Sequence, residues 1–496
     1  MKKGRLFILL LQLLVFGTSA FAQVPTPSDF DQLKAQIEAL KQQQALSQQM
    51  IAALEKKIDA IEKASPVPAP KPPTTLPETT TTAAQRPPIA APASDRAPAA
   101  QTRELFSQDR TAAPRIDNVP LDPDMQGFFR VGDSPTLMRF GGYAKLDVIH
   151  DFKIPGDPDV FITSAFPLGP VPAANSTNVQ ARQSRFNSEI RRPTPLGELR
   201  VFYENDFFGA GPTVFHLRHL YGQVHNVLVG WTYSTFMDVD SLPDTLDFEG
   251  PGSMVYVTQP QFRYTLPVTK ANSIAFSVEK PTTDINITNP NHPSVVATPT
   301  TPIPDFVIRY RYEASKGHVQ LGTVLRSVGG FAPAETSSGF VSDHAFGWGV
   351  NLSGALETWK QDSLLFQAAF GRGIGRYIED LTGLGPDAAL NSSLQLRATP
   401  AFGTFVAYQH YWHEKWRSTA TYGYAHVQGE FGQSETFFRK SNYAAFNLIW
   451  NPTGNFNVGA EYLYGNLTAK DANRGFGSRL QFSLQYDFFR WGKDSQ

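Results

Sequence analysis

Residues 480–488 read LQFSLQYDF, and their side chains alternate strictly between apolar and polar. A β-strand turns successive side chains to opposite faces, so this stretch predicts one apolar face and one polar face. The same period of two recurs in residues 262–266, 308–312, 416–424 and 456–464. These segments therefore predict a sheet whose two faces meet different surroundings.

The connections between such segments alternate in length. Short turns fall at 194–197, 225–226, 267–272, 316–317, 360–361, 413–414 and 451–454, and long connections at 153–180, 236–252, 282–303, 330–342, 375–395 and 428–438. Short turns on one side and long loops on the other are typical of an outer-membrane β-barrel. A secreted β-sandwich or solenoid is the alternative, but a sandwich would show short turns at both ends of its strands.

The strand count supports a closed barrel. Strands are expected at 138–150, 180–192, 198–208, 213–224, 227–235, 253–266, 271–280, 305–314, 318–329, 343–357, 362–374, 397–412, 415–427, 439–450, 455–467 and 475–489. The count is sixteen, an even number as bacterial single-chain barrels require, and a barrel of this size leaves an aqueous lumen. The predicted fold class is all-β, a sixteen-stranded antiparallel transmembrane β-barrel of the porin type.

The composition of the chain excludes several classes of protein. The 496 residues carry a formal net charge of -1, no cysteine and 12% aromatic residues. The charge argues against nucleic-acid binding, and the missing cysteines exclude disulfides, zinc–thiolate sites and a Cys nucleophile. Because the mean hydropathy is only -0.27, we expect the aromatic rings to face lipid and the polar residues to line the lumen. A girdle near the short turns would comprise Tyr411, Trp412, Trp416, Trp450, Phe488 and Phe489.

Residues 1–22 predict a secretory signal peptide. A basic start at residues 2–5 precedes an apolar stretch, and an A-x-A cleavage motif occupies residues 20–22. An N-terminal anchor helix is the alternative, but the apolar stretch is shorter than the ~20 residues that a membrane span needs.

Three further segments flank the predicted barrel, which occupies residues 136–489. Residues 30–61 hold a heptad register through five heptads, of which the middle one is polar at both core positions. This register predicts a coiled-coil oligomerisation stalk over residues 23–64; a single amphipathic helix packed on a globular domain is the alternative. Residues 65–135 are rich in Pro, Ala and Thr and predict an extended linker with an irregular lead-in. Residues 490–496 form a C-terminal tail.

The run from residue 183 to residue 265 resembles a known family. It contains QSRFNSEIRRPTPLGELRVFYENDFFG and STFMDVDSLPDTLDFEGP, and FGGYAKLDVIHDF and AYQHYWHEKWRSTATYGYAHV fit the same pattern. These stretches resemble the DcaP-like porins of Gram-negative outer membranes, over about residues 136–489. The tail after Phe489 departs from the family, whose barrels usually end on their terminal aromatic residue.

The resemblance implies where the protein resides and what it meets. It implies a homotrimer in the outer membrane, in contact with lipid and lipopolysaccharide, that admits small anionic solutes such as dicarboxylates and aromatic acids. The family's N-terminal coiled-coil extension matches residues 29–63 and would place the stalk in the periplasm, where peptidoglycan or periplasmic proteins are candidate partners. A structural barrel that anchors the envelope through this stalk is the alternative function.

The alternation of strand residues predicts which charged side chains face the lumen. If the apolar rows face lipid, the inward side carries several arginines, and guanidinium stays charged and binds carboxylates through paired donors. The pore-lining candidates are Arg185, Arg191, Arg200, Arg218, Arg263, Arg309 and Arg311. Ordinary structural ion pairs inside the barrel are the alternative interpretation for each of them.

The long connection of residues 236–252 follows the fifth predicted strand and is expected to fold inward as a constriction loop. Its acidic residues are Asp238, Asp240, Asp244, Asp247 and Glu249. Acids on this loop opposite arginines on the wall would create a transverse field across the opening. A porin performs no bond chemistry, so we expect no catalytic residue, cofactor or metal. His410 and His413 point to opposite faces of a strand and would not share a metal ion.

Overall fold

The computed structural model describes residues 105–488 except 121–124, 154–155, 171–173, 210, 212, 286–287, 290–291, 297, 334–339, 391–394 and 429–432. The predicted signal peptide, coiled coil and C-terminal tail lie outside the described residues, as does most of the linker. Within the described part, no helix is long and apolar enough to cross a membrane.

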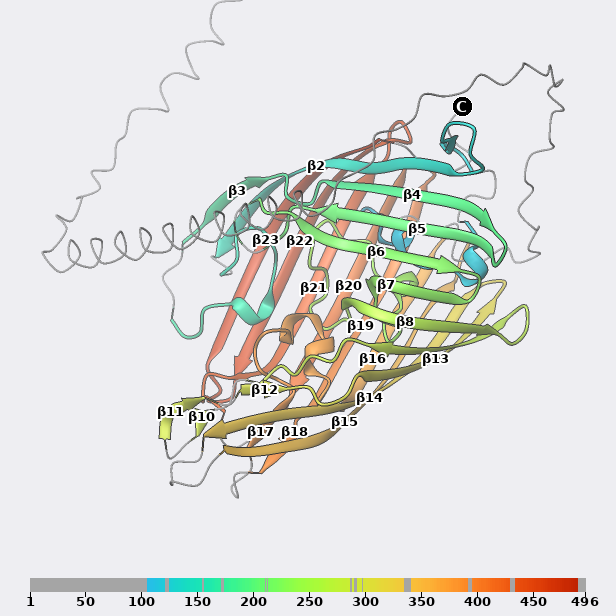
Figure 1. The fold of residues 1–496 in the computed structure, drawn as a ribbon. Helices are drawn as coiled ribbons and strands as arrows, with labels where there is room; N and C mark the ends of the chain where they lie inside the picture. The colour runs from blue at the N-terminus through green and yellow to red at the C-terminus, as the bar shows by residue number, and fades with distance from the viewer. Residues whose placement is uncertain are drawn as a thin grey trace, which may run out of the picture. The chain divides into compact units, whose positions relative to one another are not determined.

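Sixteen antiparallel strands form a closed barrel, as predicted (Figure 1). The wall strands are β2 (Leu137–Lys153), β4 (Arg185–Thr194), β5 (Gly197–Asp206), β6 (His216–Val224), β7 (Val227–Tyr233), β8 (Thr258–Pro267), β9 (Asn272–Glu279), β13 (Asp305–Ala314), β14 (Gly317–Pro333), β15 (Phe340–Glu357), β16 (Ser363–Arg372), β19 (Pro400–His413), β20 (Trp416–Val427), β21 (Phe438–Trp450), β22 (Phe456–Ala469) and β23 (Arg474–Asp487). Each pairs with its neighbours along the chain, and β23 pairs with β2 to close the ring.

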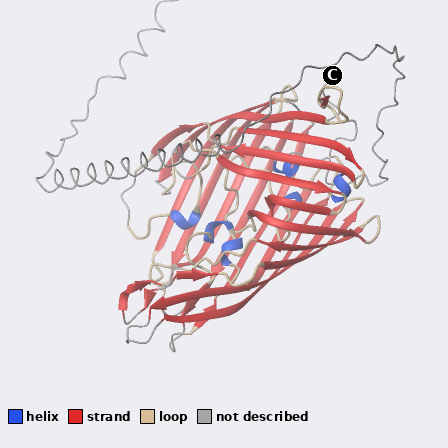
Figure 2. Ribbon diagram, viewed as in Figure 1, coloured by secondary structure: helices blue, strands red, loops and turns tan. Residues whose placement is uncertain are grey.

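The remaining elements are short and lie before the barrel or in its long connections (Figure 2). They are α2 (Asp109–Ala112), η2 (Ile116–Asn118), β1 (Phe129–Arg130), η3 (Thr163–Ala165), β3 (Ser176–Gln180), η4 (Val239–Ser241), β10 (Thr288–Asn289), β11 (His292–Val296), β12 (Thr298–Thr300), η5 (Gly375–Tyr377), η6 (Glu379–Leu381), β17 (Ala388–Leu390) and β18 (Leu396–Ala398). β4 pairs with the first half of β2 and β3 with the second half, so that together they form the one neighbour of β2 on this side of the wall.

The two faces of the wall follow the alternation seen in the sequence. On β23, Phe482 and Tyr486 are half exposed on the outer face, whereas Gln481 and Gln485 are buried on the inner face. Trp416 and Trp450 stack beside a short turn with their ring centroids 5.5 Å apart and are exposed, as a girdle requires. The outer face therefore carries an apolar row and the inner face a polar one.

Two expectations from the sequence need correction. Residues 330–342 are not mainly a long loop, because β14 and β15 stay paired from Gly317 opposite Leu356 out to Pro333 opposite Phe340. The aromatic rings also do not all face lipid: Phe161, Phe202 and Tyr377 are fully buried inside the barrel. Phe161 and Tyr377 belong to loops that enter the lumen, and Phe202 of β5 is buried in the same apolar cluster.

The pairing of β2 with β4 depends on one glycine. Gly142 has φ +125°, and a Cβ at this position would lie 2.1 Å from the carbonyl oxygen of Arg185 on β4. A side chain would therefore strain the backbone and push β4 away from β2, the strand that also pairs with β23 to close the ring.

We expect Gly142→Ala to lower the thermal stability of the folded barrel, because backbone strain of this kind costs about 1–3 kcal/mol even before the clash. The measurement is the temperature at which the folded form disappears in a heat-modifiability gel. Gly132→Ala is the matched control, because Gly132 also has positive φ but a Cβ there meets open space. Equal effects of the two substitutions would contradict the account.

Candidate pore constriction

The loop of residues 234–257, called loop 3 below, runs from β7 to β8 through the inside of the barrel. Its first anchor is Asp238, whose carboxylate contacts Arg311 of β13 at 3.1 Å, His318 of β14 at 2.8 Å and Ser353 of β15 at 2.8 Å. These strands lie well beyond β8 along the wall. Loop 3 therefore folds inward and contacts the wall two to four strands beyond β8.

The second anchor, Asp240, collects three guanidinium groups. Its carboxylate lies 2.9 Å from Arg311, 3.1 Å from Arg110 and 2.8 Å from Arg115. Burial by itself would raise the pKa of Asp240, but the three guanidiniums outweigh it and hold this pKa well below its ordinary value. Asp240 thus stays ionised and fixes the loop where it crosses the lumen.

The second half of loop 3 is held by β20 to β23 and β2. Asp244 pairs with Arg417 of β20 at 2.7 Å. The amide of Leu246 donates to Glu461 at 3.1 Å, and its carbonyl accepts from Lys145 at 2.6 Å and Gln481 at 3.0 Å. Because these strands lie on a different arc of the wall from β13 to β15, the loop spans the lumen.

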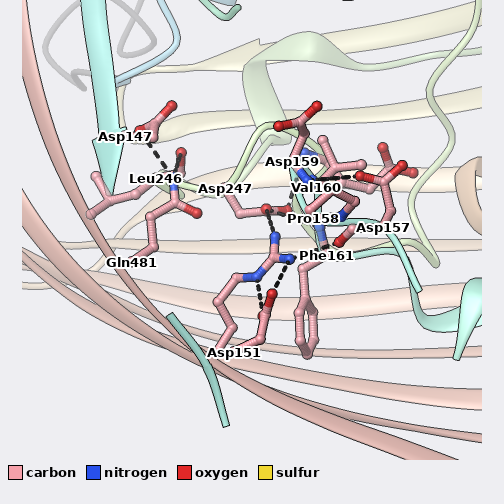
Figure 3. Close-up of polar contacts among 12 residues, drawn as sticks. Asp147, Asp151, Asp157, Pro158, Asp159, Val160, Phe161, Leu246, Asp247 and Gln481 are labelled. Atoms are coloured by element: carbon pink, nitrogen blue, oxygen red, sulfur yellow. Dashed lines mark hydrogen bonds and ion pairs between the residues drawn. The ribbon is translucent and has the colours of Figure 1, made fainter. Parts of the chain in front are cut away.

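The first long connection joins loop 3 at the same place (Figure 3). Asp247 accepts from the amide of Phe161 at 3.1 Å. Arg479 of β23 pairs with Asp151 at 2.7 Å, contacts Asp247 at 3.7 Å and donates to the carbonyl of Asp157 at 2.8 Å. One wall guanidinium therefore ties two loops to the barrel.

Four of the predicted pore-lining arginines have partners other than the loop acids. Arg200 contacts Glu189 at 2.9 Å, and Arg218 contacts Glu204 at 3.1 Å and Asp206 at 3.0 Å. Arg191 pairs with Glu189 at 2.6 Å and with Glu198 at 2.6 Å, and Arg185 lies 3.5 Å from Glu204. These wall carboxylates balance much of the charge of the arginines, and Arg185 and Arg218 bind one further carboxylate, that of Asp109.

The charges are thus arranged differently from the expected opposition of acidic loop and basic wall. Asp238, Asp240 and Asp244 contact wall arginines directly, and Glu249 contacts none in the described part. The physical reason is the cost of an unpaired buried charge, which is several kcal/mol per ion. The crowded interior therefore favours contact pairs over charges separated by an opening.

Arg263 of β8 and Arg309 of β13 differ from the other candidates. Within the described residues neither forms an ion pair. Arg263 donates to Gln261 at 3.0 Å and to the carbonyl of Tyr233, both neutral, and the buried Nε of Arg309 has no hydrogen-bond partner. Both face the lumen and are separated only by β9. They form the part of the candidate site where positive charge is not cancelled.

Sequence reasoning missed residues 105–118, which fall in the predicted linker and lead-in. The structure places them inside the barrel, where Asp109 contacts Arg185 at 2.5 Å and Arg218 at 2.9 Å. The signal was weak: Leu105 and Phe106 interrupt the polar linker just before the charged pair Asp109-Arg110. Lys145, buried on β2, was also missed; it lies 3.2 Å from Asp147.

Carboxyl groups from two loops meet without enough cations beside them. Burial, followed by the neighbouring Asp380, raises the pKa of Glu379 to about 8, and burial raises the pKa of Asp380 to about 7. Burial also raises the pKa of Asp247 to about 6 and the pKa of Glu249 well above its ordinary value. Asp380 accepts from the hydroxyl of Thr163 and, through its amide, donates to Gly252 at 2.8 Å. Burial thus disfavours the charged forms of these four carboxyl groups where the loops meet.

Comparisons with known proteins identify the family of the chain and relate its barrel fold to solved structures. A family model described as DcaP outer membrane protein matches residues 130–488. The solved structure of the outer membrane channel DcaP of Acinetobacter baumannii is 18% identical, with 73% of this chain and 99% of that chain covered and a TM-score of 0.63. OmpT of Vibrio cholerae is 10% identical, with coverages of 72% and 99% and a TM-score of 0.45. A search of curated proteins found no match.

The carboxyl junction predicts a pH dependence of loop packing. Because the pKa values of Asp247, Glu379 and Asp380 are raised in the folded state, folding of the loops favours bound protons. The packing is therefore most stable below about pH 4 to 5, where these groups are protonated in both states, and it weakens as the pH rises through about 6 to 8. Amide hydrogen exchange of residues 376–384 should accelerate across this range.

The double substitution Glu379→Gln/Asp380→Asn should flatten this pH dependence after correction for the intrinsic exchange rate. Glu435→Gln/Asp471→Asn is the matched control, since both of these carboxylates are exposed and belong to other loops. A pH profile that the first pair leaves unchanged would contradict the assignment.

Proposed function

The chain belongs to the DcaP outer membrane protein family, and from this premise we propose that it is a passive diffusion porin that prefers small organic anions, such as dicarboxylates and aromatic acids. Membership of the family makes it an outer-membrane channel of Gram-negative type. The anion preference is the further step, and it rests on the lumen wall.

The observation that supports the preference is the uncancelled charge at Arg263 and Arg309. In the described part of the chain, both lack an ion-pair partner, whereas the neighbouring Arg311 is neutralised by Asp238, Asp240 and Glu313. The nearest acid on β9, Glu279, accepts hydrogen bonds from Ser234 and Thr235, which leave its charge in place, and in the described residues it forms no ion pair with either arginine. Two guanidinium groups against one carboxylate leave this stretch of wall with a net positive charge.

A positive wall stretch acts on solutes through both charge and geometry. A guanidinium in a narrow, partly dehydrated passage attracts anions more strongly than one in bulk water, because the effective dielectric constant is lower. Its planar donors also match a carboxylate in two-point contact. Two such groups on nearby strands would favour solutes that carry one or two carboxylates.

We also propose a homotrimer whose N-terminal stalk lies in the periplasm. The periplasmic position of the stalk is supported by the end of the barrel at which the first wall strand begins. Leu137 pairs with Arg191 close to the short turn 194–197, and the amide of Asp487 donates to Asn455 in another short turn. Short turns of outer-membrane barrels are periplasmic. The chain therefore enters β2 from that side.

Charge reversal tests the proposed selectivity. Arg263→Glu/Arg309→Glu should turn anion preference into cation preference, measured as a change in the sign of the reversal potential in a KCl gradient across a planar bilayer. Arg263→Gln/Arg309→Gln should bring the reversal potential close to zero.

The control is Lys316→Glu/Lys360→Glu, which makes the same change in formal charge at exposed short turns. If this control shifts the reversal potential as much as the lumen pair does, the preference does not come from Arg263 and Arg309.

A further inference from the structure

Residues 105–118, called the strap below, cross the inside of the barrel close to its short-turn end. At one end the side-chain amide of Asn118 donates to the carbonyls of Glu198 at 2.7 Å and Gln223 at 2.9 Å, both next to short turns. At the other end Phe106 is fully buried and packs with Leu246 of loop 3 and Ile449 of β21. The strap therefore bridges the wall and loop 3.

The wall holds the strap largely by hydrogen bonds to backbone carbonyls of the strap. Tyr221 donates to the carbonyl of Ala112 at 2.8 Å, Arg191 to that of Asn118 at 2.5 Å and Arg200 to that of Ala113 at 3.3 Å. Three side chains that the alternation along the strands places in the lumen are thus already hydrogen-bonded to the strap. A solute meets them only where the strap leaves them free.

Asp109 of the strap contacts the wall in the way that a solute carboxylate would. One of its oxygens, Oδ1, accepts from Arg185 at 2.5 Å and from Arg218 at 2.9 Å, while the other accepts from Ser107 at 3.0 Å. Although burial opposes ionisation, the two arginines lower the pKa of Asp109, so the group is a carboxylate. Two converging guanidiniums on one carboxylate form a carboxylate-binding site.

Exchange of Asp109 for a solute carboxylate would conserve the local charge. Arg185 and Arg218 also contact two wall carboxylates, Glu204 and Asp206, which do not belong to the strap. A solute carboxylate in place of Asp109 would restore the same set of three acids and two guanidiniums. The cost of exposing Asp109 is offset by an equivalent pair with the solute.

We propose that the strap is an autoinhibitory element: Asp109 occupies a carboxylate site formed by Arg185 and Arg218 in the lumen, and carboxylate solutes compete with it for that site. This inference rests on the proposed anion preference and adds a way in which the anion flux is regulated. The strap lowers the anion flux at rest, and a carboxylate solute displaces Asp109 as it passes.

The first test is Asp109→Asn, which keeps the shape of the side chain but removes its charge. The ratio of chloride to potassium permeability should rise roughly two- to fivefold as the local field becomes more positive, and succinate should block the chloride current at a lower concentration. Asp133→Asn is the matched control, because Asp133 is exposed and the charge change is the same.

The second test reports on the strap without measuring current. The chain has no cysteine, so Thr111→Cys gives a single thiol on the half-buried middle of the strap. Succinate should accelerate its modification by a small thiol reagent several-fold, and the uncharged analogue succinamide should not.

Two results would overturn the inference: Asp109→Asn behaves like Asp133→Asn, or succinate leaves the labelling of Thr111→Cys unchanged in a channel that prefers anions. Failure of the proposed function has a different signature. In that case the unmodified channel shows no anion preference, or the Arg263→Glu/Arg309→Glu pair leaves the reversal potential unchanged.

Discussion

An ion inside a barrel crowded by its own loops has lost most of its water, and the cost must be met by a partner of opposite sign. In this protein that requirement organises the lumen. Loop 3 crosses it because Asp238 and Asp240 meet Arg311 on one arc of the wall and Asp244 meets Arg417 on another. The apolar side chains of the loops then fill the spaces between these fixed points.

The same constraint decides where function can reside. An arginine that already holds a wall carboxylate, such as Arg200 with Glu189, offers a passing anion little net attraction. Under the proposed function, we expect selectivity to depend on positions where the neutralisation is incomplete, as at Arg263 and Arg309, or where we propose that a solute replaces the neutralising group, as at Asp109. We expect pore selectivity to follow from these incompletely neutralised positions and from the width of the passage.

The barrel wall could be predicted from the sequence, whereas most of the segments and contacts inside the lumen could not. A strand such as residues 480–488 shows its two faces through local alternation, so the number of strands and most of their limits agree with the structure. The pair of Asp238 and Arg311 joins residues 73 positions apart, and no local pattern encodes it. Residues 105–118 were missed for a related reason: their few apolar residues gain a partner only inside the finished barrel.

The most direct test of the account is the reversal potential of the unmodified protein in a planar bilayer, with a tenfold KCl gradient and succinate then added on one side. The account predicts an open channel whose reversal potential has the sign of chloride selectivity and whose chloride current falls as succinate enters. A channel that selects potassium, or one whose current succinate does not change, would contradict it.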